Sequence, residues 1–291
     1  MALRLAPGFT TRFAPAPTGH LHLGHAVNAV WVWGMARAFG GQVRLRIEDH
    51  DRGRCRPEYE TALLDDLDWL GLVPDGATTA DFRRGAHRQR QSDNTDRYAA
   101  RLDDLESSGL AYACACARSD VDFRHPGTCR ARAIAPDATP ARRVVMGPGA
   151  PETFDDLRCG PQIQDPDLQC GDVLARDRHG NWTYQFAVAV DDLEQNVDLI
   201  VRGEDLLEST GRQLRLGRLL GRATPPLYLH HPLVRHADGR KLSKSAHDTS
   251  LRALRASGRT SEDILGLAAH LGGLQPEPTP LRASALDSLF R

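Results

Sequence analysis

The segment "RFAPAPTGHLHLGHA", residues 12–26, decides how this chain folds. The residues around its start, "TTRFAP" (10–15), form a β-branched and apolar run that ends at a proline, which predicts a strand. The residues from its end onward, "HAVNAVWVWGMARAFGG" (25–41), are apolar on nearly all sides and stop at two glycines, which predicts a buried helix. A strand, a loop and a buried helix in this order open an α/β sheet, whose ligands bind beyond the carboxyl ends of the strands.

The pattern continues outward from this unit. The alternating run "QVRLRIED" (42–49) predicts a second strand. Apolar residues at helical spacing predict helices over 57–72, 97–110 and 205–220. Two further strand-like runs, 171–177 and 182–192, flank the turn "RHGN". We therefore expect an α/β fold built on a Rossmann-like parallel sheet.

Composition narrows the class of protein. A chain of 291 residues with 41% hydrophobic content can bury a large core, so we expect one main domain with an appendage. It has no apolar run long enough to span a membrane, and its start lacks the apolar region of a secretory signal, so we expect a soluble cytoplasmic protein. The formal net charge of −1 neither indicates nor excludes nucleic acid as a partner.

The histidines of "HLHLGHA" (20–26) raise the question of a metal site. A helix-borne zinc motif needs ligands at i, i+4 spacing, which His20, His22 and His25 do not provide. The N-terminus of a helix instead offers unpaired N–H groups and a positive dipole end, which favour phosphate. We interpret His22 and His25 as hydrogen-bond donors to phosphate, and Gly24 as a position where a planar base can lie against the backbone.

Lysine is confined to one place. Lys241 and Lys244, in the loop "RKLSKS" (240–245), are the only lysines among 37 Lys and Arg residues. A compact ammonium group on a flexible loop can close over a polyphosphate, and the rigid fork of arginine does not replace it. The loop therefore predicts a second part of the same phosphate site.

The pair "HLGH" (22–25) and "KLSKS" (241–245) resembles the two signatures of class I aminoacyl-tRNA synthetases. Residues 12–26, 45–72, 184–192 and 199–221 are similar, in this order, to the glutamyl branch of that family. The residues after Ser245 are too few for the helical anticodon-binding domains of full-length members. The resemblance is therefore to the shortened branch that transfers glutamate to queuosine in tRNA(Asp).

The resemblance implies a domain organisation and a reaction. It places the two halves of the catalytic domain at 1–111 and 144–245, a zinc-binding insertion at 112–143, and a short helical tail at 246–291. It implies that ATP, with Mg²⁺, activates L-glutamate as glutamyl-adenylate. The glutamate then passes to the queuosine base in the anticodon stem-loop of tRNA(Asp), by a protein expected to be a monomer.

The resemblance also assigns residues. It assigns ATP binding to His22, Gly24, His25, Lys241 and Lys244, of which His22, His25 and Lys244 are expected to be catalytic. It assigns glutamate binding to Arg12, Phe13, Ala14, Pro15, Ala16, Glu48, Tyr184 and Arg202. Guanidinium groups pair with a carboxylate and reject the neutral amide, so the two arginines favour glutamate over glutamine.

A cysteine cluster predicts a metal centre. Cys114, Cys116, His125 and Cys129 supply four nitrogen and sulfur ligands, enough for a tetrahedral structural zinc site. The family has a tyrosine where this chain has His125, and Asp120, Asp122 or a water molecule stay open as the fourth ligand. The alternative is a group of buried, metal-free thiols.

RNA contacts are the least visible feature of the sequence. Arg212, Arg215, Arg218 and Arg222 lie at spacings of three or four residues. Such a helix face can follow phosphates or simply face solvent. Two rival functions stay open: an enzyme that charges the 3′ end of a tRNA with a binding domain on another chain, and a non-catalytic RNA-binding paralogue.

Overall fold

The computed structural model of the chain describes residues 5–117, 124–132, 134, 139–234 and 250–291. Lys241 and Lys244, and the alternative zinc ligands Asp120 and Asp122, lie outside the described residues. Among the helices that are described, none combines the length and the apolar character needed to cross a bilayer.

The opening unit has the predicted order. Strand β1 (Thr10–Phe13) leads through the histidine-rich loop into helix α1 (Leu23–Ala38), and strand β2 (Gln42–Leu45) returns parallel to β1. The two strands end earlier than predicted. Prolines follow β1, and after β2 the ladder stops and Ile47 forms an isolated bridge with Arg90 instead. Helix α1 is buried along most of its length, as its apolar sequence predicts.

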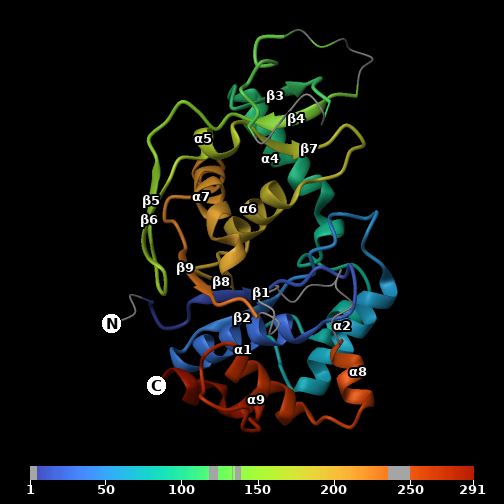
Figure 1. Cartoon of the computed structure of the whole chain (residues 1–291). Coiled ribbons are helices and arrows are strands. Elements are labelled where there is room, and N and C mark those ends of the chain that lie inside the picture. The colour runs from blue at the N-terminus through green and yellow to red at the C-terminus, as the bar shows by residue number, and fades with distance from the viewer. Residues whose placement is uncertain (1–4, 118–123, 133, 135–138, 235–249) are drawn as a thin grey trace.

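A second parallel pair lies beside the first (Figure 1). Strands β8 (Leu199–Gly203) and β9 (Leu227–His231) run parallel, with Arg202 opposite His230. The amide of Asp198, just before β8, donates to the carbonyl of Thr10 on β1 over 2.8 Å. Strand β5 (Glu152–Asp156) continues the sheet beyond β9 and forms a hairpin with β6 (Gly160–Gln164). The predicted α/β class with a parallel sheet is confirmed.

The prediction of a strand over 182–192 is wrong. This segment is mainly helix α6 (Tyr184–Glu194), and the predicted helix over 205–220 is a 3₁₀ segment (Glu204–Ser209) followed by α7 (Thr210–Leu219). Helix α6 packs against α7 and β7, so consecutive residues along it are buried. A helix without a polar face has the same apolar run as a buried strand, which is why the pattern misled.

Two of the remaining helices, α2 (Pro57–Leu70) and α4 (Thr95–Ser107), lie close to the predicted spans 57–72 and 97–110. The short helix α3 (Thr79–Arg83) was not predicted. Helix α2 begins at a proline and ends at Gly71, whose φ of 71° is the left-handed conformation of a glycine stop.

The cysteine-rich segment lies at one end of the molecule, at the top of Figure 1. There β3 (Ala111–Cys114), β4 (Ala141–Val144) and β7 (Val173–Arg176) form a three-stranded antiparallel sheet, with the short helix α5 (Pro166–Cys170) nearby.

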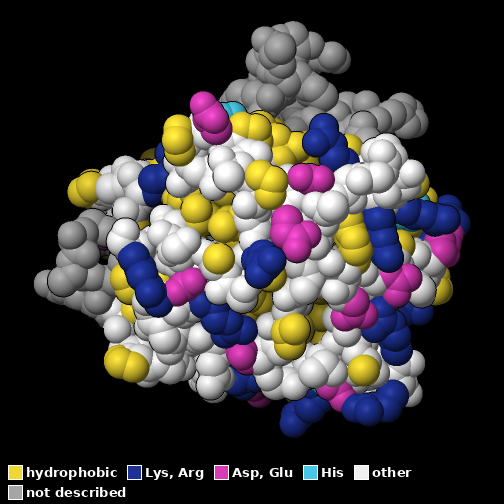
Figure 2. Space-filling model, turned by 90° about the horizontal axis from the view of Figure 1, so that it is seen from below, with side chains coloured by type: hydrophobic (Ala, Val, Ile, Leu, Met, Phe, Trp, Pro, Cys, Tyr) yellow, Lys and Arg dark blue, Asp and Glu magenta, His cyan; other side chains and the backbone are white. Residues whose placement is uncertain are grey.

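The C-terminal tail covers the opposite end. Helices α8 (Leu251–Ala256) and α9 (Ser261–Leu271) are followed by a 3₁₀ segment (Ala283–Phe290), and both α9 and this segment pack on α1. The rings of Trp31 and Phe290 lie 5.3 Å apart. Figure 2 shows basic and acidic side chains interspersed over the face seen from this end. The tail thus completes the core around α1.

Candidate active site and cysteine centre

A cavity of about 580 Å³ opens where β1 and β8 end and α1 begins. Its walls contain these predicted residues: Arg12, Phe13, Ala14, Pro15, Ala16, His22, Gly24, His25, Glu48, Tyr184 and Arg202. Its size lies in the range of small-molecule sites, about 300–1,000 Å³. The structure therefore brings the predicted glutamate residues together with the described part of the predicted ATP site.

The two histidines at the start of α1 are oriented by the backbone. The amide of Gly24 donates to Nδ1 of His22 over 3.1 Å, and the amide of His22 donates to Nδ1 of His25 over 3.2 Å. A neutral imidazole whose Nδ1 accepts a hydrogen bond carries its proton on Nε2. Both rings therefore present Nε2–H as a donor at the N-terminus of a helix, where negative charge is favoured.

The glycine between these histidines has a steric reason. A Cβ atom on Gly24 would lie 2.9 Å from Cε1 of the His22 ring. Any side chain at this position would push His22 away from its hydrogen bond. His20, the third histidine, packs its ring edge-on against Tyr59 at 5.1 Å and is not among the residues that line the cavity.

Arg12 belongs to a buried network of charges. Its Nε lies 3.2 Å from Oδ1 of Asp192, and the same oxygen accepts from Arg46 over 2.6 Å. Arg46 is fully buried and also donates to Oε1 of Glu48 over 2.9 Å. Burial lowers the pKa of Arg46 but the carboxylates of Asp192, Glu48 and Asp191 raise it further, so its pKa lies well above the usual value and it stays charged.

Arg202 has different partners. Its guanidinium donates to the imidazole of His230, the side-chain oxygens of Gln213 and Thr210, and the carbonyl of Leu206. Each acceptor is formally neutral, and no ion pair of Arg202 with a carboxylate is found among the described residues. The arginine is nonetheless 4% exposed. A buried cation whose hydrogen-bond acceptors are all neutral is suited to an incoming carboxylate.

Tyr184 supplies a neutral donor. It is the first residue of α6, and burial together with the negative charge of Glu48 raises the pKa of its phenol above the usual value. The hydroxyl therefore keeps its proton at neutral pH. Glu48 accepts two hydrogen bonds from Arg46 at Oε1, and it lines the cavity.

The cavity also has walls that sequence reasoning missed. They include Thr18, Asn28, His50, Arg54, Asp205 and His231. Asn28 donates to the carbonyl of Val201 over 3.3 Å and lies 3.2 Å from Nε2 of His231, so it ties α1 to β8 and β9. Its spacing of three residues from His25 on the same helix was a signal that could have found it.

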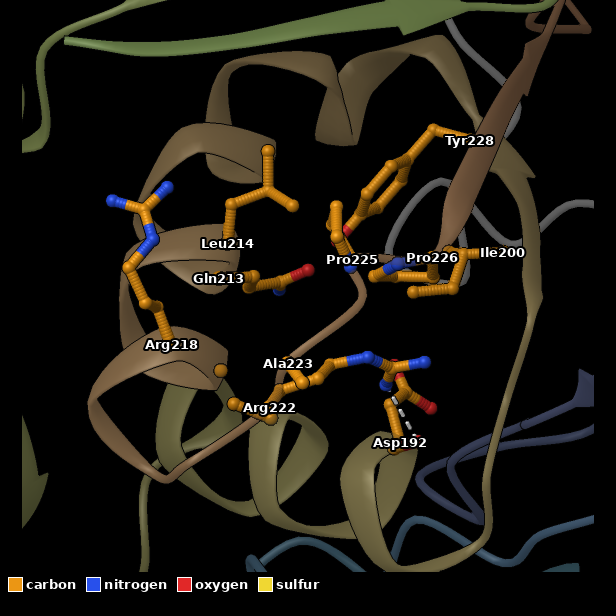
Figure 3. A pocket seen from close by; sticks show the side chains of 12 residues that line it. Asp192, Ile200, Gln213, Leu214, Arg218, Arg222, Ala223, Pro225, Pro226 and Tyr228 are labelled. Atoms are coloured by element: carbon orange, nitrogen blue, oxygen red, sulfur yellow. Dashed lines mark hydrogen bonds between the residues drawn. The ribbon is translucent and has the colours of Figure 1, made fainter.

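The residues that hold the arginines border a second cavity of about 310 Å³ (Figure 3). Asp192, Gln213 and Tyr228 line it, and the guanidinium of Arg202 lies 5.3 Å above the ring of Tyr228. In Figure 3 the side chain of Arg222 reaches toward Asp192, whose carbonyl it contacts over 2.8 Å. Asp192, Gln213 and Tyr228, which contact the arginines of the first cavity, were not predicted from the sequence.

The arginine series on α7 does not form an exposed stripe. Arg215 is buried and donates to Glu152 and to the carbonyls of Met146 and Ala150. Arg218 also pairs with Glu152, and Arg222 donates to backbone carbonyls. Arg215 clamps α7 to neighbouring segments because burial demands partners for its charge, whereas Arg218 is 65% exposed. The series therefore does not face solvent as one stripe, and the interpretation as a phosphate-tracking face is not supported.

Three of the four predicted metal ligands, the cysteines, come together, and His125 is not part of the group. Cys114, Cys116 and Cys129 place their sulfur atoms within 4.8 Å of one another, close enough to hold a metal ion, and no other such group occurs in the part of the chain that is described. Although burial raises it, hydrogen bonds from Ala115 and Cys116 lower the pKa of Cys129 to about 7, which favours the thiolate.

His125 lies beside this cluster. Its Nε2 is 3.4 Å from Sγ of Cys114, and its Nδ1 is within reach of the amide of Gly127 and the phenol of Tyr112, at 3.1 and 3.3 Å. Tyr112 in turn donates to Asp172 over 2.6 Å. Because Nδ1 accepts from the Gly127 amide, a neutral His125 carries its proton on Nε2, and that proton has to leave before Nε2 can bind a metal ion.

Comparison with known proteins agrees with this geometry. Residues 9–131 and 143–278 match the family described as "tRNA synthetases class I (E and Q), catalytic domain". A glutamyl-Q tRNA(Asp) synthetase of Nitratidesulfovibrio vulgaris is 39% identical, with 92% of this chain and 88% of that protein covered. One of Cupriavidus metallidurans is 41% identical, with 92% and 86% covered.

Solved structures show the same fold. The crystal structure of a glutamate tRNA ligase from Elizabethkingia meningosepticum, with its amino acid, superposes with a TM-score of 0.81 at 24% identity. The match covers 97% of this chain and 64% of that chain. By its catalytic domain and its relatives, the chain belongs to the class I tRNA synthetases of the E and Q type, in the branch of the glutamyl-Q tRNA(Asp) synthetases.

Proposed function

We propose that this protein activates L-glutamate with ATP and transfers it to the queuosine base in the anticodon of tRNA(Asp). One observation carries the proposal: buried arginines for a carboxylate and histidine donors at a helix N-terminus line one cavity. The names of the relatives supply the RNA substrate. Such an enzyme works where tRNA is found, so we place it in the cytoplasm. By the family pattern we expect it to be a monomer.

In the first step, an oxygen of the α-carboxylate of glutamate attacks the α-phosphorus of ATP. A new P–O bond forms, the bond to the bridging oxygen breaks, and pyrophosphate leaves with the electron pair. Mg²⁺ bound with ATP would balance the charge of the leaving group. Negative charge grows on the phosphoryl oxygens, where Nε2–H of His22 and His25 donate. We assign Lys241 and Lys244 to the same phosphates by the family pattern.

Substrate selection rests on the charged and phenolic side chains of the cavity. Arg202 and Arg12 receive a carboxylate of glutamate, Tyr184 donates to it, and the Oε2 side of Glu48 accepts from the ammonium group. Phe13 through Ala16 form the wall next to them. A glutamine amide would leave a buried guanidinium without its anionic partner, so we expect glutamine to be rejected.

In the second step, a hydroxyl of the cyclopentenediol of queuosine attacks the carbonyl carbon of the adenylate. An ester bond forms, AMP leaves, and the hydroxyl proton passes to solvent or to the phosphate. The anticodon loop has to reach the cavity for this step, so the catalytic domain itself receives the stem-loop.

We propose that the three thiols and His125 bind one structural zinc ion. Three sulfurs and one imidazole satisfy the tetrahedral preference of zinc, and the ion would tie the segment before β4 to β3. Its contribution is to folding of this end of the molecule. No step of the reaction involves it.

The first experiment follows glutamate-dependent exchange of labelled pyrophosphate into ATP in the absence of tRNA. We expect exchange with glutamate and little with glutamine. A protein that shows no exchange with glutamate, with or without tRNA(Asp), would contradict the proposed activation step and favour the non-catalytic alternative.

The second experiment locates the product. Labelled glutamate is offered with tRNA(Asp) that contains or lacks queuosine, and with queuosine-containing tRNA from which the 3′-terminal adenosine has been removed. We expect label in both queuosine-containing RNAs and none in the unmodified one. Label that requires the terminal adenosine would show 3′-end charging instead.

A further inference from the structure

A buried hydrogen-bond relay stands behind Arg202. Strand β5 ends at Asp156, whose Oδ2 lies 2.6 Å from Nδ1 of His230 on β9, and Nε2 of the same ring lies 3.0 Å from Nε of Arg202 on β8. Both side chains of the Asp156–His230 pair are fully buried. Three neighbouring strands therefore each supply one member of the relay.

The relay admits one arrangement of protons. Nε of Arg202 is always a donor, so Nε2 of His230 has to be an acceptor. A ring with unprotonated Nε2 carries its proton on Nδ1, which then donates to Asp156. Burial first, and the charge of Arg202 as well, lower the pKa of His230, which keeps the ring neutral at physiological pH.

Asp156 is itself held in place by backbone. The amides of Arg158 and Cys159 donate to its Oδ1 over 3.0 and 2.7 Å, and the amide of His230 donates to its Oδ2 over 3.1 Å. Burial raises the pKa of Asp156, but the hydrogen bond from the His230 side chain and those from the amides of Cys159 and Arg158 lower it to about 2. The acceptor for Nδ1 of His230 is therefore a fixed carboxylate.

The relay matters because Arg202 is surrounded by neutral acceptors. Gln213, Thr210 and Leu206 occupy further N–H groups of its guanidinium, which has five. If His230 carried a proton on Nε2, this N–H would face the Nε–H of Arg202, and two donors repel each other. The guanidinium would then have to turn away from its position in the cavity wall.

We infer that His230, oriented by Asp156, is a positioning residue: as a neutral Nδ1–H tautomer it fixes the guanidinium of Arg202 for the carboxylate of the amino acid substrate. This inference rests on the proposed glutamate activation. The inference adds two residues, His230 and Asp156, that lie behind the cavity wall and contribute to substrate specificity through Arg202.

The test compares four variants. Asp156→Asn keeps an oxygen for the loop amides but can present an NH₂ group to His230, which favours the wrong tautomer. His230→Phe removes the acceptor for Arg202, whereas His230→Gln can both accept from Arg202 and donate to Asp156. Asp177→Asn is the matched control, because Asp177 also caps a turn through backbone amides, at 2.8 Å, but lies in the β7–α6 connection.

The measurements are the KM for glutamate and kcat in pyrophosphate exchange, with a melting curve for each variant. We expect Asp156→Asn and His230→Phe to raise the KM for glutamate about tenfold or more, the equivalent of losing one charge-assisted hydrogen bond, with a small change in kcat. His230→Gln should stay closer to wild type than His230→Phe, and Asp177→Asn should match wild type.

A spectroscopic readout keeps the inference testable if a variant folds poorly. In ¹⁵N-histidine-labelled wild-type protein without substrate, the ring signals missing from His230→Gln should show a protonated Nδ1 and an unprotonated Nε2. The reverse tautomer overturns the inference, as does an unchanged KM in Asp156→Asn. A wild-type protein that neither binds glutamate nor catalyses exchange defeats the proposed function instead.

Discussion

The substrate cavity and the cysteine cluster are both built from polar groups, yet they are held together in opposite ways. In the cavity wall, Arg12 and Arg46 share Asp192, and Arg202 rests on His230 and Gln213, so the chain supplies the partners for its own charges. In the cluster, like groups face one another: Sγ of Cys116 and Sγ of Cys129 lie 3.5 Å apart, with a hydrogen bond from the side chain of Arg132 to Cys129 beside them.

The difference is one of preorganisation. Buried ion pairs hold their geometry before any ligand arrives, because each charge that leaves its place loses its partner. Three thiolates repel one another and converge only around a cation. The cavity should therefore be complete without ligand, whereas the cluster should depend on its ion.

The largest expected effect comes from removing the shared carboxylate of the cavity. Asp192→Ala leaves the fully buried Arg46 without its shortest ion pair and frees Arg12. We expect a loss of about 3–5 kcal/mol in the free energy of unfolding, the usual cost of breaking a buried pair. Urea denaturation measures it, with Asp177→Ala in an exposed turn as control. A loss below that of the control would show that the network does not hold the cavity.

The next effect is on catalysis. Arg202→Ala should lower kcat/KM for glutamate by a factor equivalent to about 2–5 kcal/mol. Removing Arg202 leaves the substrate carboxylate without its partner, and truncating one member of a buried, hydrogen-bonded charge pair has that cost. Arg202→Lys should recover little, since an ammonium lacks the fork that His230 and Gln213 hold. Arg37→Ala is the control, because Arg37 lies near the C-terminal end of α1 and forms a partly exposed ion pair with Asp75. Equal rates for Arg202→Ala and the control would remove Arg202 from the site.

The third prediction concerns the cluster. Cys116→Ser should reduce bound zinc from one per chain to near none, while Cys170→Ser, outside the cluster, should leave it unchanged. Pyrophosphate exchange without tRNA should be nearly unaffected, because the cavity is built by its own charges. Metal analysis and exchange assays on the same samples decide both points. Zinc that persists in Cys116→Ser would exclude our ligand set.

The smallest effect tests a buried carboxylate that lacks such partners. Burial, and the neighbouring Asp65, raise the pKa of Asp66 on α2 to about 7. Between about pH 4 and 7 the folded protein therefore binds a proton that the unfolded chain does not, so this group makes stability fall as pH rises. Three pKa units would correspond to about 4 kcal/mol, and the high effective dielectric constant of real protein sites reduces this, so Asp66→Asn should remove that slope and gain about 1–2 kcal/mol over wild type at pH 8 relative to pH 4. A difference between variant and wild type that is independent of pH would contradict the assignment.

Local patterns account for the parts of the site that were predicted. Strand β1, the loop and α1 are contiguous, so the capping residues His22 and His25 and the glycine between them could be placed from a few adjacent letters. The cysteine cluster spans few residues and was found for the same reason.

The residues that support the site were not predicted. Asp192 lies 180 positions from Arg12, and His230 lies 74 from Asp156. A carboxylate or an imidazole inside an apolar run gives no sign of which charge it will meet. Helix α6 was mistaken for a strand because packing on several sides removed the polar face that marks a helix.

The sequence by itself determined the class of fold, the place of the cavity at the strand ends, and the residue types that meet phosphate and carboxylate, because these follow from short-range periodicity and side-chain chemistry. Only the tertiary structure decided which arginine is balanced by a carboxylate and which is held by neutral acceptors. That distinction depends on contacts between segments far apart in the chain. These contacts are buried, and in a buried site each unpaired charge has a large cost in free energy.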